Sequence, residues 1–563
     1  MNTEIFGVLT MFVITVLLAI PTGRYIAKVF GNEATALDKI FNPIDRLFFR
    51  LSGIDPKREM SWQQHVVALL TINLVWFILS MIVLTNMAWL PLNPDGNPSM
   101  SVDLAFNTSV SFVTNTNLQH YSGESGMSYL GQLILMLWQF ISAGTGIAIC
   151  AVVFTAMKAR SAAMLGNFYS QFVRSCTRIL LPIALLVASL LLFAGTPMTF
   201  EGKDQITTLE GDSVEVSRGP VAAFVAIKHL GTNGGGFFGA NSAHPLENPN
   251  YFTNMVQMVT QMLIPMAIVF AAGFFLRRKK FSRMIFGVMT IGFLLLVMPT
   301  IVAETGGNSK ITELGISQNS GSMEGKETRF GAGASAYWSI ATTVISTGSV
   351  NAMHDSYTPI SGMNQLLGMM TNCFYGGVGV GFLNFYIFII LAVFISGLMV
   401  GRTPEFMGKK IEAPEMKIAM LVALLHPFLI LAGSALAVAL PEVTSATLSN
   451  PGFHGFSQIL YEFTSSAANN GSGFEGLGDN TPFWNISCGI VMLLARYLPI
   501  IGPVAIAGML AQKSYIPESS GTLPTDSTTF GLMVFSVIAI VAALSFFPAI
   551  TLGPIAEYFS MIN

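Results

Sequence analysis

Apolar residues are gathered into ten long runs separated by polar, glycine-rich segments. A membrane-spanning helix needs about 20 mainly apolar residues, and most of these runs reach that length. The pattern therefore predicts an all-α polytopic membrane protein with about ten transmembrane helices. The runs lie near residues 4–23, 65–90, 128–157, 177–195, 252–276, 284–303, 365–400, 417–440, 484–511 and 529–550.

The overall composition supports a membrane location and excludes several other classes. Hydrophobic residues make up 52% of the 563 residues and charged residues only 10%, against about 25% charged in an average globular protein. The net charge of -2 gives no basic surface for nucleic acid. The four cysteines form no CxxC pair, so the sequence predicts neither a disulfide framework nor a zinc site.

Lys and Arg are distributed very unevenly between alternate loops. Of the 28 basic residues, 21 fall in segments 24–62, 158–178, 277–283, 402–417 and 512–528, and six fall in the intervening loops. Because basic loops stay on the cytoplasmic side, we expect both chain termini outside the cytoplasm. The intervening loops hold 18 of the 30 acidic residues, which would attract cations.

Each of the four outer loops has the same anatomy, which indicates a fourfold internal repeat. A short amphipathic piece (101–112, 219–230, 333–345 and 455–466) is followed by a Gly-, Asn-, Thr- or Ser-rich cluster and then by the next span. Taking Thr116, Gly234, Gly348 and Gly471 as equivalents, the spacings are 118, 114 and 123 residues, typical of duplication. The predicted repeats are 62–157, 174–276, 281–400 and 416–511, with extra helices in 1–30 and 528–563.

Short helices followed by polar loops can form a binding site for a bare monovalent cation. Pieces of about twelve residues reach only about 18 Å, too short to cross a membrane, so we expect them to enter it and turn back. Irregular backbone at membrane depth survives only where it lines a cavity or is buried in protein. Four such loops around an axis would present carbonyl rings that replace the hydration shell of an ion.

Several long stretches closely resemble the potassium-binding, channel-like A subunit of the bacterial Kdp potassium-pumping ATPase. The resemblance covers nearly the whole chain. It is carried by SFVTNTNLQHYSGE (111–124), LGTNGGGFFGANSAHPLENP (230–249), SMEGKETRFG (322–331), NAMHDS (351–356), GRTPEFMGKKIE (401–412), NPGFHGFSQILYEFTSSAANNGS (450–472) and SSGTLPT (519–525).

This resemblance implies a bacterial cell-membrane subunit with a fourfold pseudosymmetric, potassium-channel-like fold. It implies potassium as the transported ion, lipid contacts, and a complex with a P-type ATPase catalytic subunit, a single-span subunit and a very small membrane subunit. Gln119 would lie just past the first filter segment. The implied selectivity filter consists of Val113, Thr114, Asn115, Thr116, Thr232, Asn233, Gly234, Ser346, Thr347, Gly348, Asn469, Asn470 and Gly471.

The third inner span contains four glycines in six residues, which should break its helix. Asn372, Gly376, Gly377 and Gly379 would form an unwound segment that gates passage below the filter; the alternative is that these glycines allow close helix packing. Some members of the family carry Glu where Asn372 stands, so the resemblance does not extend to a carboxylate at the exit.

Two arginines stand at or within inner spans. The family resemblance suggests that Arg402 and Arg496 line the inner pore and oppose cation leakage. An ionisable residue within a span usually faces a cavity or a partner group. For Arg402 an anchoring role at the membrane surface is an equal alternative.

The sequence contains no motif for using ATP. GxxxxGK[ST] and the phosphorylated-Asp motif DKTG are both absent, so we expect a non-catalytic subunit that binds no nucleotide. Two other functions remain open: an autonomous channel or symporter subunit of the Trk and Ktr type, and a polytopic enzyme acting on lipid. No catalytic arrangement of residues favours the enzyme.

Overall fold

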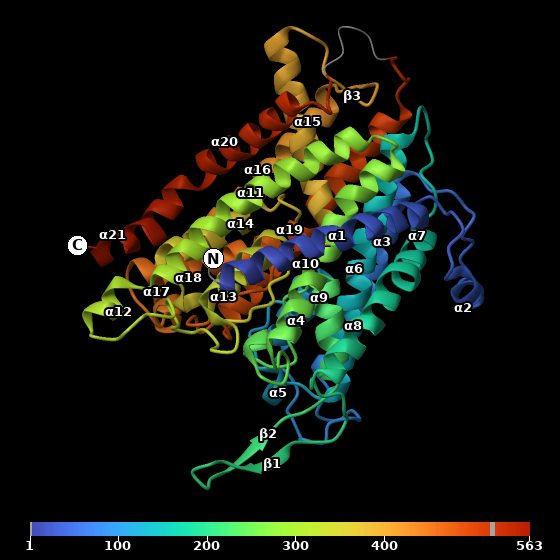
Figure 1. Ribbon diagram of the computed structural model, residues 1–563. Helices are drawn as coiled ribbons and strands as arrows, with labels where there is room; N and C mark the ends of the chain where they lie inside the picture. Colours follow the sequence, from blue (N-terminus) through green and yellow to red (C-terminus); the bar gives the residue numbers. More distant parts are fainter. Residues whose placement is uncertain (1–2, 518–523, 563) are drawn as a thin grey trace.

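Ten helical segments are long and apolar enough to cross a membrane, which confirms the predicted number within the part of the chain that is described. The computed structural model describes residues 3–517 and 524–562 (Figure 1). The stretch 519–525 therefore lies mostly outside the described residues. The spans are α1 (Thr3–Phe30), α3 (Trp62–Leu84), α6 (Tyr129–Lys158), α7–η1–α8 (Phe168–Arg174, Ser175–Leu180, Leu181–Phe193), α10 (Tyr251–Phe275), α11 (Lys279–Gly306), α15 (Val380–Val400), α16 (Ala413–Ala439), α19 (Pro482–Gln512) and α20–η5–α21 (Thr528–Ile550, Thr551–Ile555, Ala556–Ile562).

Four short helices lie between successive pairs of spans, and each is followed by an irregular segment. Their bounds agree with the predicted pieces to within two residues at each end. We call these short helices pore helices. They are α4 (Val102–Val113), α9 (Val221–Leu230), α13 (Gly331–Val344) and α18 (Phe453–Ala468).

The predicted span 365–400 is interrupted, as its glycines indicate. Helix α14 (Pro359–Thr371) ends at Asn372, and α15 begins only at Val380. Between them the backbone adopts positive φ at Asn372, Tyr375, Gly376 and Gly379. Such left-handed conformations are incompatible with a continuous right-handed helix. We call residues 372–379 the break.

Smaller elements complete the fold. They are α2 (Asp38–Ser52), α5 (Gly123–Gly126), η2 (Asn241–Ala243), α12 (Ser309–Glu313), η3 (His354–Ser356), α17 (Pro441–Thr444) and η4 (Ser445–Thr447), with the antiparallel pairs β1 (Asp204–Thr207) with β2 (Ser213–Val216) and β3 (Glu405–Phe406) with β4 (Lys409–Lys410). The amphipathic helix α2 was not expected. One face, with Asp38, Asn42 and Asp45, binds the buried Arg178 of η1.

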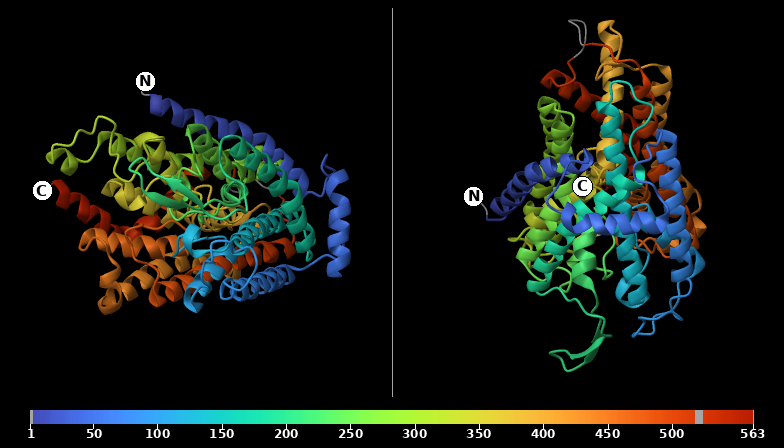
Figure 2. Two further views of the ribbon diagram at one scale, coloured as in Figure 1. Left: turned by 90° about the horizontal axis from the view of Figure 1, so that it is seen from below. Right: turned by 90° about the vertical axis from the view of Figure 1, so that its right-hand side faces the viewer.

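The helices form one bundle in which the first and last spans flank the four units. Helix α1 packs along α10, and α20 packs against α11 and α15 (Figure 2). The β1–β2 hairpin projects from one end of the bundle, and β3 lies at the opposite end (Figure 1). We call the β3 end the basic end, because the connection that carries Arg402, Lys409 and Lys410 lies there.

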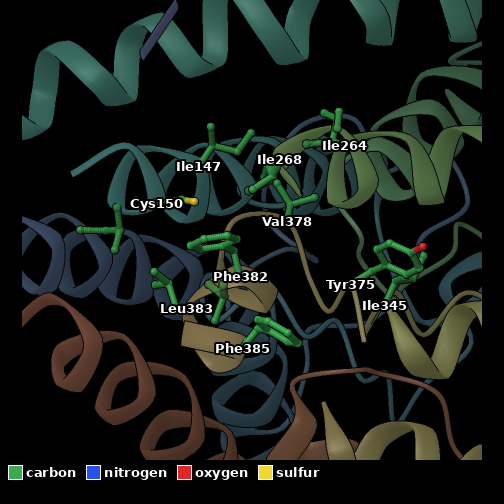
Figure 3. Close-up of a cluster of buried hydrophobic side chains, with 14 of the residues drawn as sticks. Ile147, Cys150, Ile264, Ile268, Ile345, Tyr375, Val378, Phe382, Leu383 and Phe385 are labelled. Carbon is green, nitrogen blue, oxygen red and sulfur yellow. The ribbon is translucent and has the colours of Figure 1, made fainter. Parts of the chain in front are cut away.

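Apolar packing holds the break in place from one side. Figure 3 shows Tyr375 and Val378 of the break among side chains that include Ile147 of α6 and Ile264 of α10. The Tyr375 hydroxyl also bonds the Thr290 hydroxyl of α11 at 2.6 Å. Packing on this side therefore anchors the middle of the break firmly against α6, α10 and α11.

Candidate functional site

The segments that follow the pore helices converge on one another. A Cβ added at Gly234 would lie 2.8 Å from the Gly471 Cα and 2.9 Å from the Asn470 carbonyl oxygen. A Cβ at Gly348 would collide with the Asn470 carbonyl, and one at Gly471 with the Thr116 carbonyl. Only glycine allows this approach. These contacts bring the Thr116 and Asn470 carbonyl oxygens, from the first and fourth repeats, against glycines of other repeats. We call the converging segments filter segments after the role predicted for them; they are 115–117, 232–234, 346–348 and 469–471.

A shared hydrogen-bond pattern aligns the four filter segments. In each, one amide N–H reaches back to the carbonyl five residues earlier, at 2.8–2.9 Å; the donors are Thr116, Asn233, Thr347 and Asn470. The preceding residue adopts a positive φ in every repeat: Asn115, Thr232, Ser346 and Asn469.

This alignment corrects the sequence alignment of the first repeat by one residue. Asn117 (φ 59°), rather than Thr116, is the equivalent of Gly234, Gly348 and Gly471. The error arose because Asn takes the place of glycine there, and Asn is among the few residues that tolerate a left-handed backbone. Val113 and Thr114 accordingly lie before the first filter segment, at the end of α4, where Thr114 bonds the Thr116 hydroxyl at 2.8 Å.

Buried amides join neighbouring filter segments. The Asn115 amide donates to the carbonyls of Gly231 and Thr232 at 3.0 and 3.3 Å, and its oxygen accepts from Ser142 and Asn233 at 2.7 and 2.8 Å. All four hydrogen-bonding directions of the Asn115 side chain are therefore used. Such a network fixes the spacing of the first two segments.

The first and second loops are also joined just past the filter, by Gln119. Its amide donates to the Gly236 carbonyl at 3.2 Å, and its oxygen accepts from the Gly236 N–H at 2.8 Å. The amide also donates to the Tyr121 hydroxyl at 2.9 Å. Gln119 is thus a bridge between two repeats, placed beside the segments that the sequence assigned to the filter.

A buried ion pair, missed in the sequence, supports the second filter segment. Lys228 at the end of α9 donates to Glu247 at 2.5 Å and to Asn241 at 2.6 Å. The Asn241 amide in turn donates to the Gly234 carbonyl at 2.6 Å. Lys228 and Glu247 are fully buried. In the sequence, Lys228 and Glu247 each stand as an isolated charge among apolar or small residues, and this was the available signal of a buried pair. That the two charges meet depends on the fold.

The break lies directly against the filter segments. Ser346 donates to the Asn372 side chain at 2.8 Å, and the Val378 N–H donates to the Thr232 hydroxyl at 3.0 Å. A Cβ at Gly377 would be 3.6 Å from the Thr232 hydroxyl oxygen, and one at Gly379 would strike the backbone of Gly146 in α6. The sequence-predicted residues of the break and of the filter therefore come together.

A cavity lies beneath the filter, on the side toward the basic end. Asn115, Ser346 and Asn469 contribute to its wall from the filter, and Asn372, Gly377 and Asn384 from the third inner helix. Arg496 of α19 also lines it and is only 6% exposed. Among the described residues its Nη2 has no hydrogen-bond partner. One guanidinium thus lies in the wall of the cavity that Asn115, Ser346 and Asn469 also line.

Arg402 does not join Arg496, contrary to the expectation that both line the inner pore. Helix α15 begins only after the break, so it continues to Val400 before the chain leaves the bundle. Arg402 therefore lies exposed beside the β3–β4 hairpin at the basic end, and it is not among the residues that line the cavity. The positions of the two arginines within their spans are not equivalent.

These features define a class: a multi-pass membrane protein whose four re-entrant loops meet at one buried polar site above a cavity. The family model described as Potassium-transporting ATPase A subunit matches residues 9–559. The chain belongs to this family.

Curated relatives match over the full length. Proteins named potassium-transporting ATPase potassium-binding subunit are 65% identical in Flavobacterium psychrophilum and 58% in Bacteroides thetaiotaomicron, each over 100% of both chains. One from Geobacillus kaustophilus is 47% identical over 98% of both. The solved structure of the potassium transporter TrkH from Vibrio parahaemolyticus is 14% identical, with a TM-score of 0.49 over 89% of this chain and 98% of that one.

Proposed function

We propose that this chain is the potassium-binding and translocating subunit of an ATP-driven uptake pump. Potassium enters from the side of the acidic loops, loses its water in the four filter segments, and passes toward a P-type ATPase partner. The observation that carries the proposal is the convergence of the filter segments, with carbonyls of Thr116 and Asn470 at the glycines of other repeats. Carbonyl oxygens are the groups that replace potassium hydration in selective filters.

The lower boundary of the site is proposed to be the break together with Arg496. The break touches two filter segments, so a shift of the break would alter the exit from the filter. The Arg496 guanidinium opposes a cation that leaves straight through the cavity, because like charges repel strongly where water is scarce. Ions would then continue only when the partner subunit changes the conformation of this region.

The assembly and topology belong to the same proposal. The relatives' name supports an ATPase catalytic subunit as a partner, and we further propose the single-span and very small subunits implied by the resemblance. The bacterial cell membrane is the proposed location, with both termini outside. Repeats bounded at 62–157, 174–276, 281–400 and 416–511 fit the order of helices. ATP hydrolysis is assigned to the partner.

The test is potassium-stimulated ATP hydrolysis by the assembly purified through a tag on this chain. Hydrolysis that requires potassium and a co-purifying ATPase is expected. An intact chain without an ATPase, which conducts potassium in liposomes, would overturn the pump proposal and favour the autonomous channel or symporter.

A further inference from the structure

Three ligand-type side chains from distant parts of the sequence meet behind the first and fourth filter segments. They are His120, Glu462 of α18 and Cys488 of α19, and all three are buried. The Glu462 Oε1 lies 3.1 Å from His120 Nε2 and 3.5 Å from Cys488 Sγ. Asp479 Oδ2 is 4.0 Å from the same histidine nitrogen. No short sequence motif links these residues, which is why cysteine spacing gave no sign of them.

The hydrogen bonds aim the histidine at the cluster. The Asn485 amide nitrogen donates to Asp103 at 2.8 Å and to Asn480 at 3.2 Å, so its oxygen is the atom that faces His120 Nδ1, at 2.7 Å. Nδ1 must therefore carry a hydrogen, which leaves Nε2 directed at Glu462. A histidine held in this way by an outer hydrogen bond is typical of metal ligands.

A second, independent observation also indicates an occupant. The other carboxylate oxygen of Glu462, Oε2, is buried and has no hydrogen-bond partner among the described residues. An unsatisfied buried carboxylate oxygen is costly, because it has lost its water without compensation. A cation bound by the Glu462 carboxylate would compensate its buried charge.

We propose that His120, Glu462 and Cys488 bind one Zn²⁺ ion, with the fourth position left to water. Zinc takes His nitrogen, Cys sulfur and carboxylate oxygen ligands at about 2.0–2.3 Å in a tetrahedral arrangement. Ligand atoms of a tetrahedron with such bonds are about 3.3–3.8 Å apart, close to the 3.1 and 3.5 Å that separate Glu462 Oε1 from His120 Nε2 and Cys488 Sγ. Binding releases the Cys488 thiol proton and any proton on Nε2.

The ion would enter past Asp479, whose side chain is 26% exposed while that of His120 is fully buried. The bound ion would then join the loop after the first filter segment to α18 and α19 of the fourth unit. Because His120 follows Asn117 by only three residues, zinc would restrain the filter from outside. We therefore expect zinc to raise the melting temperature of the protein.

The test uses the full-length chain in its native assembly, purified through a tag that contains no histidine. After dialysis we expect about one zinc per chain, and Co²⁺ substitution should give the near-ultraviolet band of thiolate-to-cobalt charge transfer. Cys488→Ser should abolish that band and reduce zinc affinity by more than the roughly 10–100-fold typical of losing an outer partner. Cys150→Ser, at a buried cysteine within the apolar core, is the matched control.

Two results would overturn the proposal. One is a folded wild-type protein that retains no zinc and shows no thiolate–cobalt band, a measurement that needs no variant to fold. The other is zinc binding that persists unchanged in Cys488→Ser and His120→Gln, which would place the ion elsewhere. The control variant Cys150→Ser must retain the metal in both experiments.

Discussion

Ser346 donates its hydroxyl hydrogen to the Asn372 side-chain oxygen at 2.8 Å, joining the third filter segment to the first residue of the break. Asn372 also donates to the Ala468 carbonyl at the end of α18, at 3.3 Å. One side chain thus ties the start of the break to two repeats. We therefore expect a change in the break to alter the filter segments.

Removing the Asn372 side chain should loosen the exit. Asn372 has a φ of 44°, so Asn372→Gly keeps the backbone conformation but removes the bonds to Ser346 and Ala468. Each lost bond is worth about 1 kcal/mol. We expect passive potassium leakage in proteoliposomes to increase in Asn372→Gly and to remain low in Asn372→Asp, which retains the acceptor for Ser346. Equal leakage in both variants would show that the hydrogen bond between Ser346 and residue 372 does not control the exit.

Alanine at Gly348 should impair potassium binding. Its Cβ would collide with the Asn470 carbonyl and would lie 2.9 Å from the Gly234 Cα, and its positive φ of 80° disfavours any side chain. We expect the potassium concentration for half-maximal ATPase stimulation to rise at least about tenfold, equivalent to about 1.4 kcal/mol. Gly287→Ala is the control, because a Cβ there meets nothing within 4 Å. An unchanged potassium dependence in Gly348→Ala would remove this residue from the filter.

Arg496 and Arg402 allow the same substitution to be compared at a residue that lines the cavity and at an exposed residue. Arg496→Gln removes the charge from the cavity beneath the filter, so we expect faster passive cation flux and weaker coupling of ATP hydrolysis to transport. Arg402→Gln changes an exposed residue at the basic end and should leave flux unchanged. Isotope flux in proteoliposomes without ATP measures both. The same flux in the two variants would contradict the blocking role of Arg496.

Much of this architecture could be predicted from the sequence because it depends on local patterns. Hydropathy predicted the spans, and the length of the short amphipathic pieces predicted the pore helices. The clustered glycines predicted the break. What failed depends on contacts between distant residues. The one-residue shift at Asn117 follows from backbone conformation, and the exposure of Arg402 follows from where α15 starts. The pairing of Lys228 with Glu247, and of His120 with Glu462, exists only once four units have packed together.

The buried pair of Lys228 and Glu247 should stabilise the second loop only as a pair. Removing one partner of a buried ion pair costs about 3–5 kcal/mol, because the other charge remains without compensation. Lys228→Met should therefore lower the melting temperature strongly, and the double variant Lys228→Met/Glu247→Gln should recover much of the loss. Thermal unfolding in detergent at fixed potassium concentration measures both. No recovery in the double variant would show that the other bonds of these side chains, from Lys228 to Asn241 and from the Phe238 N–H to Glu247, account for the effect.

A pH-dependent contribution to stability is expected from His454 at the start of α18. Burial alone would lower its pKa, but hydrogen bonds with Asp355 and Glu557, at 3.0 and 2.8 Å, raise the pKa to about 10 from 6.5. Because the folded-state pKa is the higher one, the stabilisation is complete below pH 6.5 and is lost as the pH rises toward 10.

We therefore expect His454→Gln to lower the melting temperature most below pH 6.5 and to differ little from the wild type at pH 10. Melting curves of both proteins across this range give the difference directly, and other titrating groups common to both largely cancel. A difference that stays constant from pH 6.5 to 10 would mean that His454 is held by packing, such as its stacking on Phe474 at 5.7 Å, rather than by its charge.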